Sequence, residues 1–183
     1  MLGTVVRGAA AGSMHTLLVS DHGQVYACGQ GRYGRLGLGH EKNSFTMTEV
    51  KGAAIKNTRI QSVVCGWDFS LACGNGRVYA WGRGDVGQCG VDDSPPSGLS
   101  GFTRPVLVTG DIAGSDVVQL AAGFSHTIAL TDEGRMYSWG QGEGGQLGNC
   151  QVLATLPQRV RVSPLYTLSL YIALYYQLPI AYL

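Results

Sequence analysis

Three stretches of this chain repeat one another, and this repetition constrains the fold more than any single motif. They are "AAAGSMHTLLVSDHGQVYACGQGRYGRLGLG", "VVCGWDFSLACGNGRVYAWGRGDVGQCG" and "LAAGFSHTIALTDEGRMYSWGQGEGGQLG". Their anchor glycines, Gly12, Gly66 and Gly123, are 54 and 57 residues apart. A period of this length indicates a repeat architecture, in which each unit packs chiefly on its neighbours.

Each unit contains four segments of strand-like composition. The first segment ends in Ala-Gly or Cys-Gly. A polar turn that contains glycine separates the second segment from the third, and this glycine supplies the positive φ that a tight hairpin needs. In the first unit the second, third and fourth segments are residues 16–20, 24–28 and 45–50. In the second unit they are residues 70–73, 77–81 and 102–108, and in the third unit residues 127–131, 135–139 and 156–162. Four short strands per unit predict an all-β fold, a partial β-propeller of about three four-stranded blades.

The repeats divide the chain into a propeller region and a tail. We expect blades at about 1–50, 55–108 and 112–162, which together make a repeat region of 1–162, followed by an apolar, divergent tail at 163–183. As a helix, the uncharged tail would rise about 30 Å, close to the hydrocarbon thickness of a bilayer. A membrane-tethered propeller is therefore one alternative. Pro164, Pro179 and scattered polar residues favour a divergent end without membrane contact.

A glycine pattern in each unit fits the loop of a dinucleotide-binding enzyme. It recurs at 29–34, 82–87 and 140–145. A pyrophosphate loop requires a helix directly after it, whereas the stretch after Gly87 has the composition of turns. Recurrence in all three units favours a structural role in the repeat, and we expect neither a cofactor nor a metal. The repeat glycines are Gly29, Gly34, Gly82, Gly87, Gly140 and Gly145.

Composition argues against several functional classes. The chain has 13 basic and 12 acidic residues, so no basic field supports direct nucleic acid binding. Its five cysteines form no C-x-x-C pair, which favours buried thiols over zinc ligands or a disulfide framework. No catalytic motif of the common hydrolase, metalloprotease or P-loop types is present. Without a clear signal-peptide core at the N-terminus, we expect a cytoplasmic or nuclear location, or both.

The stretch at residues 121–148, "AAGFSHTIALTDEGRMYSWGQGEGGQLG", resembles the regulator of chromosome condensation repeat family at almost every defined position. That pattern runs A-x-G-x-x-H-[ST]-x-x-[LV], then D-G-x-[VL]-Y-x-W-G, then G-x-x-G-Q-L-G. This chain departs from the family pattern where Cys28 stands in place of the Trp, Phe69 in place of the His and Cys89 in place of the Leu. The resemblance implies a ring that typically has seven blades. Three blades would need further blades, or self-association, to close such a ring.

The resemblance also implies that partners dock on propeller faces, with contact residues in the G-x-x-H turns. The candidates for partner binding are Trp67, Asp68, Phe69, His15 and His126. We expect the two histidines to hold their turns by hydrogen bonds. Trp67 beside an acid is either an exposed contact residue or packs on the adjacent blade.

The stretch "CGWDFS" resembles the guanine nucleotide exchange branch of the family, which implies a small GTPase as the partner. We therefore expect a non-catalytic protein that mediates protein–protein interaction, either as a scaffold or as part of an exchange factor.

Overall fold

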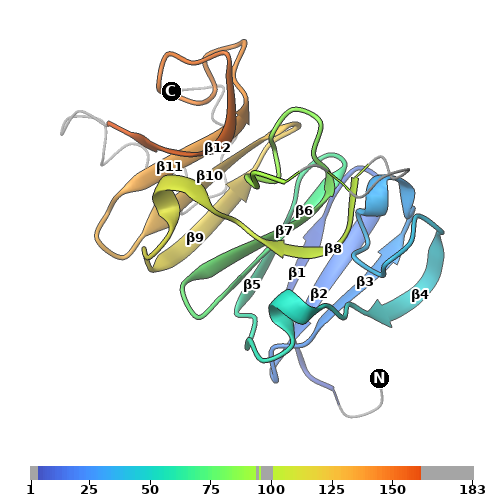
Figure 1. Cartoon of the computed structure of the whole chain (residues 1–183). Helices are drawn as coiled ribbons and strands as arrows, with labels where there is room; N and C mark the ends of the chain where they lie inside the picture. Colours follow the sequence, from blue (N-terminus) through green and yellow to red (C-terminus); the bar gives the residue numbers. More distant parts are fainter. Residues whose placement is uncertain (1–3, 94, 96–100, 162–183) are drawn as a thin grey trace.

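The computed structural model describes residues 4–93, 95 and 101–161, and this part of the chain forms three four-stranded antiparallel sheets. Each sheet is one blade, made of four strands that are consecutive in the chain (Figure 1). The first blade comprises β1 (Val6–Ala11), β2 (His15–Ser20), β3 (Val25–Gly29) and β4 (Ser44–Glu49). The second comprises β5 (Ser62–Cys65), β6 (Phe69–Gly74), β7 (Arg77–Arg83) and β8 (Gly101–Leu107). The third comprises β9 (Val117–Ala122), β10 (His126–Thr131), β11 (Met136–Gln141) and β12 (Leu153–Val160). The prediction of an all-β, partial propeller is confirmed.

The middle blade is buried on both faces, because a neighbouring blade lies on each side of it. Every residue of β6 is buried, and only the ends of β7 reach the surface. This explains why these strands read as nearly continuous apolar runs, whereas β2 in the first blade alternates between buried and half-buried positions.

A glycine marks a register shift between the third and fourth strands of each blade. Gly29, Gly82 and Gly140 lie at these shifts and have φ values of 110°, 100° and 101°. A Cβ on Gly82 would lie 2.7 Å from the Asp68 carbonyl oxygen, which is too close for a side chain to fit. Residues 84–93 then form turns and bends and no α-helix, so the geometry that a dinucleotide loop requires does not follow this glycine pattern.

Two tryptophans join neighbouring blades. Trp81 Nε1 donates a hydrogen bond to the Arg35 carbonyl oxygen of the first blade at 2.9 Å. Trp139 Nε1 donates to the Gln88 carbonyl oxygen of the second blade at 3.0 Å. Both indoles are completely buried, so the second and third blades each insert one Trp against the glycine loop of the blade before it.

The first blade differs at the equivalent position. The pattern predicts that Tyr26 and Cys28 share a buried face, as the pairs Tyr79 with Trp81 and Tyr137 with Trp139 do. Tyr26 and Cys28 are only half-buried, so that prediction is wrong for this blade. The three described sheets do not close a ring, and no other sheet of this part of the chain packs on this face of the first blade.

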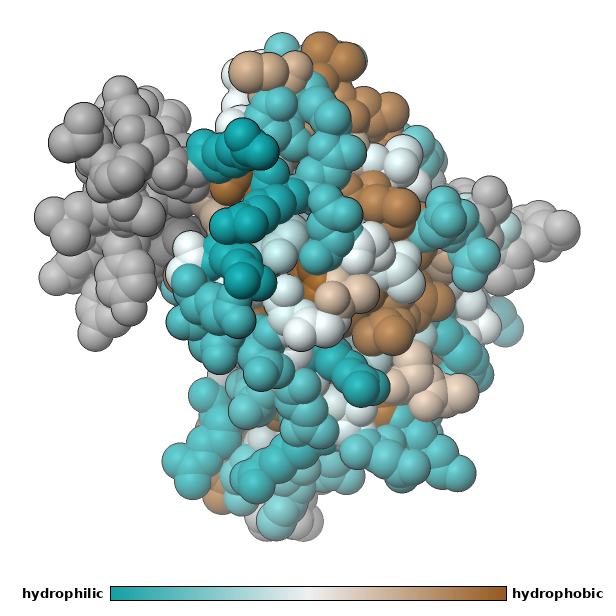
Figure 2. All heavy atoms as spheres, turned by 60° about the vertical axis from the view of Figure 1, so that its left-hand side comes forward, coloured by the Kyte–Doolittle hydropathy of each residue, from teal (hydrophilic) through white to brown (hydrophobic). Residues whose placement is uncertain are grey.

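Hydrophilic residues cover most of the side of the molecule shown in Figure 2, and hydrophobic residues emerge between them in smaller areas. The connections of the described part of the chain contain the 3₁₀ helices η1 (Arg32–Gly34), η2 (Ala53–Ile55) and η3 (Gly110–Ile112). Within the described ranges, no helix is long and apolar enough to cross a membrane. The tail at 163–183 lies outside the described residues.

Candidate functional site

The turns between the first two strands of the three blades lie at one end of the propeller. The loop after the third strand lies at the same end, since His15 begins β2 opposite Gly29 at the end of β3. A backbone hydrogen bond of 2.9 Å closes each turn, from Gly12 N to His15 O in the first blade and from its equivalents in the others. We refer to this end as the turn face.

The ring at the fourth position of each turn covers the glycine at the first. A Cβ on Gly12, Gly66 or Gly123 would overlap the ring of His15, Phe69 or His126 respectively. The turn thus requires a flat ring packed on glycine, which explains how Phe replaces His in the second blade. Phe69 and His15 are buried and His126 is half-buried, so these three predicted contact residues support the turns from inside.

We expected the His15 side chain to form a hydrogen bond across its own turn, but it forms one to the second blade instead. Its Nε2 lies 2.9 Å from Ser70 Oγ, which donates a 2.7 Å hydrogen bond to the Arg35 carbonyl oxygen. Because the Ser70 proton is used there, His15 Nε2 is the donor and its Nδ1 is an unprotonated, buried atom without a partner. Burial and the nearby Arg35 charge lower the pKa of His15 to about 4.

Trp67 and Phe124 form a stacked pair on the turn face. Their ring centroids are 4.9 Å apart and their planes are inclined by 26°, although they belong to different blades. The two residues remain 50% and 57% exposed, and Met14 of the first turn is exposed as well. Trp67 therefore both packs on the adjacent blade and presents half of its surface to solvent. Two large, pre-stacked rings at the surface have the character of a protein-contact site.

Asp68 is satisfied within the protein. Its Oδ1 lies 2.8 Å from Arg35 Nη1 and 3.2 Å from Ser13 Oγ. Ser13 also donates to the Trp67 carbonyl oxygen and accepts a hydrogen bond from Arg35 Nη1 at 3.2 Å. The Arg35 and Asp68 side chains are only 3% and 14% exposed. Asp68 thus fixes the backbone that carries Trp67, and little of its carboxylate is available to a partner.

Three arginines lie around the Tyr33 ring beside this network. The guanidinium carbons of Arg32, Arg35 and Arg83 lie 4.6, 5.7 and 5.2 Å from the centroid of the Tyr33 ring. Arg83 also donates hydrogen bonds from Nε and Nη2 to both oxygens of the Asp85 carboxylate, and these raise the pKa of Arg83. Arg32 is exposed, so the turn face combines aromatic surface with a positive edge.

Three residues of this site were not among those predicted from the sequence. Phe124 could have been found, because it occupies the same turn position as Trp67. Arg35 and Ser13 reach Asp68 from the preceding blade, and nothing in the local sequence signals that contact. Among the residues that the structure describes, no group of three or more His, Cys, Asp or Glu side chains is placed to hold a metal ion.

Comparison with known families gives a match over most of the chain. A model described as "Regulator of chromosome condensation (RCC1) repeat" matches residues 22–73, 75–130 and 133–166. A second model with the same description matches residues 6–35, 60–88 and 117–146, which span the turns and glycine loops described above.

Individual proteins show the same likeness. The chain is 32% identical over 147 residues to the ultraviolet-B receptor UVR8 of Arabidopsis thaliana, covering 80% of this chain and 32% of that protein. It is 33% identical over 138 residues to the secretion-regulating guanine nucleotide exchange factor of Bos taurus, covering 75% of this chain and 28% of that protein. The crystal structure of human WBSCR16 superposes with a TM-score of 0.75 at 26% identity, covering 88% of this chain and 40% of that one. The chain thus spans about a third of the length of these two curated relatives.

Proposed function

Because this chain belongs to the regulator of chromosome condensation (RCC1) repeat family, we propose that it is a non-catalytic propeller segment that binds a protein partner through its turn face. The stacked pair of Trp67 and Phe124 carries this proposal. It places two large rings side by side at the junction of two blades and leaves about half of each exposed. Aromatic residues of this kind contribute most of the binding energy in many protein interfaces.

The network beneath the pair supports the proposal. Arg35 and Ser13 of the first blade hold the backbone of Trp67 and Asp68, and Phe124 of the third blade holds the Trp67 ring. A contact surface that is already ordered loses little conformational entropy when a partner binds. Three blades thus contribute to one preorganised site, of which Trp67 is the centre.

The finer part of the proposal concerns the partner, which we propose is a small GTPase. One matched relative is named a guanine nucleotide exchange factor. Exchange requires only that the propeller binds the nucleotide-free GTPase more tightly than the loaded form, so no residue of this chain makes or breaks a covalent bond. We also propose that further blades or self-association close the ring, and that the protein is cytoplasmic or nuclear, or both.

A panel of purified small GTPases loaded with a fluorescent guanine nucleotide tests both parts. Binding and nucleotide release are measured with the chain, with Trp67→Ser/Phe124→Ser and with the control Phe45→Ser. Phe45 on β4, an outer strand of the first blade, is 96% exposed, so its loss removes an exposed aromatic side chain that belongs to neither the Trp67 turn nor the Phe124 turn. We expect one GTPase to bind the chain. The double variant should bind it tenfold or more weakly, which is the order of magnitude expected for the loss of a hot spot. Phe45→Ser should have little effect on binding.

The two readouts separate the two parts of the proposal. A GTPase that binds without faster nucleotide release would leave a scaffold and exclude exchange by this chain. Binding that persists unchanged in the double variant would place the contact surface elsewhere.

A further inference from the structure

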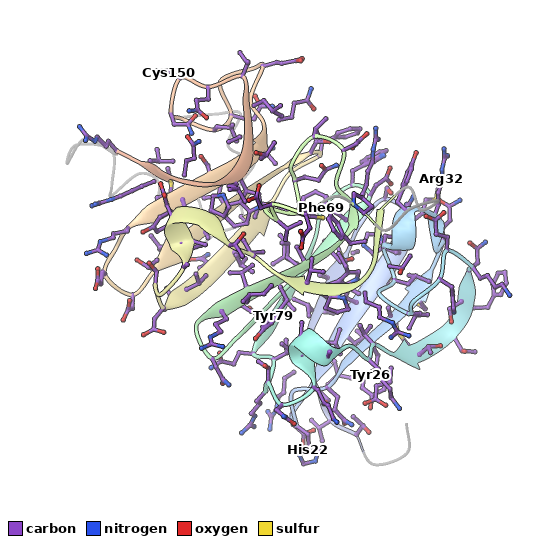
Figure 3. The ribbon with its side chains drawn as sticks, viewed as in Figure 1. His22, Tyr26, Arg32, Phe69, Tyr79 and Cys150 are labelled. Carbon is purple, nitrogen blue, oxygen red and sulfur yellow. The ribbon has the colours of Figure 1, made fainter. Side chains whose placement is uncertain are left out.

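A second surface lies at the opposite end of the blades. It is a pocket of about 660 Å³ between the first and second blades, formed by the turn after β2, the end of β4, the connection through η2 and Arg104 of β8. His22 at its edge and Arg32 on the turn face lie at opposite ends of the first blade in Figure 3. The described residues that line it all belong to the first two blades and their connection, so the first two blades are enough to form this pocket. We call it the basic pocket.

The charges that line the basic pocket are predominantly positive. Four cations, Lys51, Lys56, Arg59 and Arg104, face one carboxylate, that of Glu49, which leaves an excess of three positive charges. Glu49 is paired with Lys51 at 3.1 Å. Arg104 donates a hydrogen bond to the Lys51 carbonyl oxygen and Arg59 one to the Asp21 carbonyl oxygen, each at 2.6 Å. Carbonyl acceptors orient these guanidinium groups without neutralising them, so their charges remain available to an anionic ligand.

Beneath the cations lies an aliphatic floor. The lining includes Val25, Val50, Ile55 and Ile60, all of which are buried. A pocket with an apolar floor and charged walls suits a ligand that carries both an apolar group and negative charge.

The next junction provides an internal comparison. A pocket of about 290 Å³ lies at the equivalent place between the second and third blades. Its floor is also aliphatic, formed by Val78, Val108, Ile112 and Val117. Among its described lining residues, Arg77 alone is charged. The repeat fold therefore accounts for the floor, but it does not account for the four cations or the greater size of the first pocket.

We propose that the basic pocket binds an acidic peptide segment of a partner protein, with an aliphatic side chain on the floor and flanking Asp or Glu side chains on the cations. A peptide fits better than a single-stranded nucleic acid, because the lining residues that the structure describes include no Phe, Tyr or Trp side chain to stack on a base. The site is separate from the turn face, so the propeller has a binding surface at each end.

Fluorescence anisotropy with the full chain tests this site. The probe is a short fluorescein-labelled peptide with a central Leu flanked by Glu residues. Matched probes replace Glu by Gln or Leu by Ser, and an oligothymidine of equal charge represents nucleic acid. We expect saturable binding of the Glu/Leu peptide, and this binding should weaken with added salt. Each matched probe and the oligothymidine should bind at least tenfold more weakly, a difference that corresponds to about 1.4 kcal/mol.

Variants locate the binding on the protein. Lys51→Gln/Lys56→Gln removes two exposed cations that make no buried contact, so we expect a normal fold by circular dichroism and about tenfold weaker binding. Arg77→Gln, at the equivalent pocket, serves as the control and should leave binding unchanged.

Several outcomes would overturn the proposal. They are the absence of saturable binding, equal binding by the Lys51→Gln/Lys56→Gln variant, or equal binding of the oligothymidine. The Trp67→Ser/Phe124→Ser variant should bind the peptide normally, so failure here is distinct from failure of the proposed function at the turn face.

Discussion

Arg35 of the first blade and Asp68 of the second form an ion pair that is almost wholly buried, with Nη1 and Oδ1 2.8 Å apart. At the next junction the equivalent positions hold Gln88 and Ser125, which carry no charge. The charged pair is therefore particular to the first junction, where it fixes the turn that presents Trp67. Burial lowers the pKa of Arg35, and the nearby Asp68 charge opposes that shift.

Breaking this pair should destabilise the chain more than removing both partners. Arg35→Gln leaves a largely buried carboxylate whose nearest remaining cation is Arg83 Nη1 at 4.0 Å, and we expect the free energy of unfolding to fall by about 3 kcal/mol. Arg35→Gln/Asp68→Ser reproduces the residues of the next junction. Its loss in the free energy of unfolding should be smaller than the sum of the losses in Arg35→Gln and Asp68→Ser. Urea denaturation of the four proteins measures the coupling. Additive effects would show that the two side chains do not depend on each other.

Adding a methyl group at two glycines should have different effects. A Cβ on Gly90 would lie 2.7 Å from Trp139 Nε1, whereas a Cβ on Gly145 would meet nothing within 4 Å. Both have positive φ, 66° and 80°. We expect Gly145→Ala to cost about 1 kcal/mol for the backbone alone. Gly90→Ala should cost about 2 kcal/mol more because the buried indole must move. Thermal unfolding compares the two, and equal losses would contradict the packing of Trp139 on this loop.

The buried His15 should make stability depend on pH. Its pKa is about 4 in the folded protein against an ordinary 6.5, so the unfolded chain binds the proton more readily. The neutral ring therefore stabilises the fold fully above pH 6.5, and this contribution, about 3 kcal/mol, is lost as the pH falls towards 4. His15→Phe imitates Phe69 of the second blade and should flatten this part of the profile. Denaturation series at several pH values test it, and an unchanged slope in the variant would assign the effect to other groups.

The cysteines should differ widely in reactivity. Burial raises the pKa of Cys73 to about 11 and also raises that of Cys89, whereas Cys150 is exposed. We expect iodoacetamide to alkylate Cys150 rapidly in the native protein and the two buried thiols only after unfolding. Mass spectrometry of peptides after timed labelling measures the order. Early labelling of Cys89 would indicate that the junction between the second and third blades opens readily.

Much of the fold could be predicted from the repeat because the residues that specify a blade are close together in sequence. Alternating apolar residues, a hairpin turn and a glycine at each register shift define the strands of β2, β3 and their equivalents locally. The contact site could be predicted only in part. Trp67 departs from its neighbours within an aligned turn and so attracts notice, whereas its supports Arg35 and Phe124 come from positions 32 and 57 residues away.

The sequence by itself determined the all-β class, the number of blades and the places where the chain turns, because these depend on periodicity and on residues within one repeat. Only the tertiary structure decided which of the turn residues face solvent. It showed that His15 and Phe69 pack inward on glycine, that Asp68 is held by Arg35, and that four cations surround one pocket. Those arrangements arise where two blades meet, and burial and ion pairing at a junction depend on side chains that the linear sequence keeps apart.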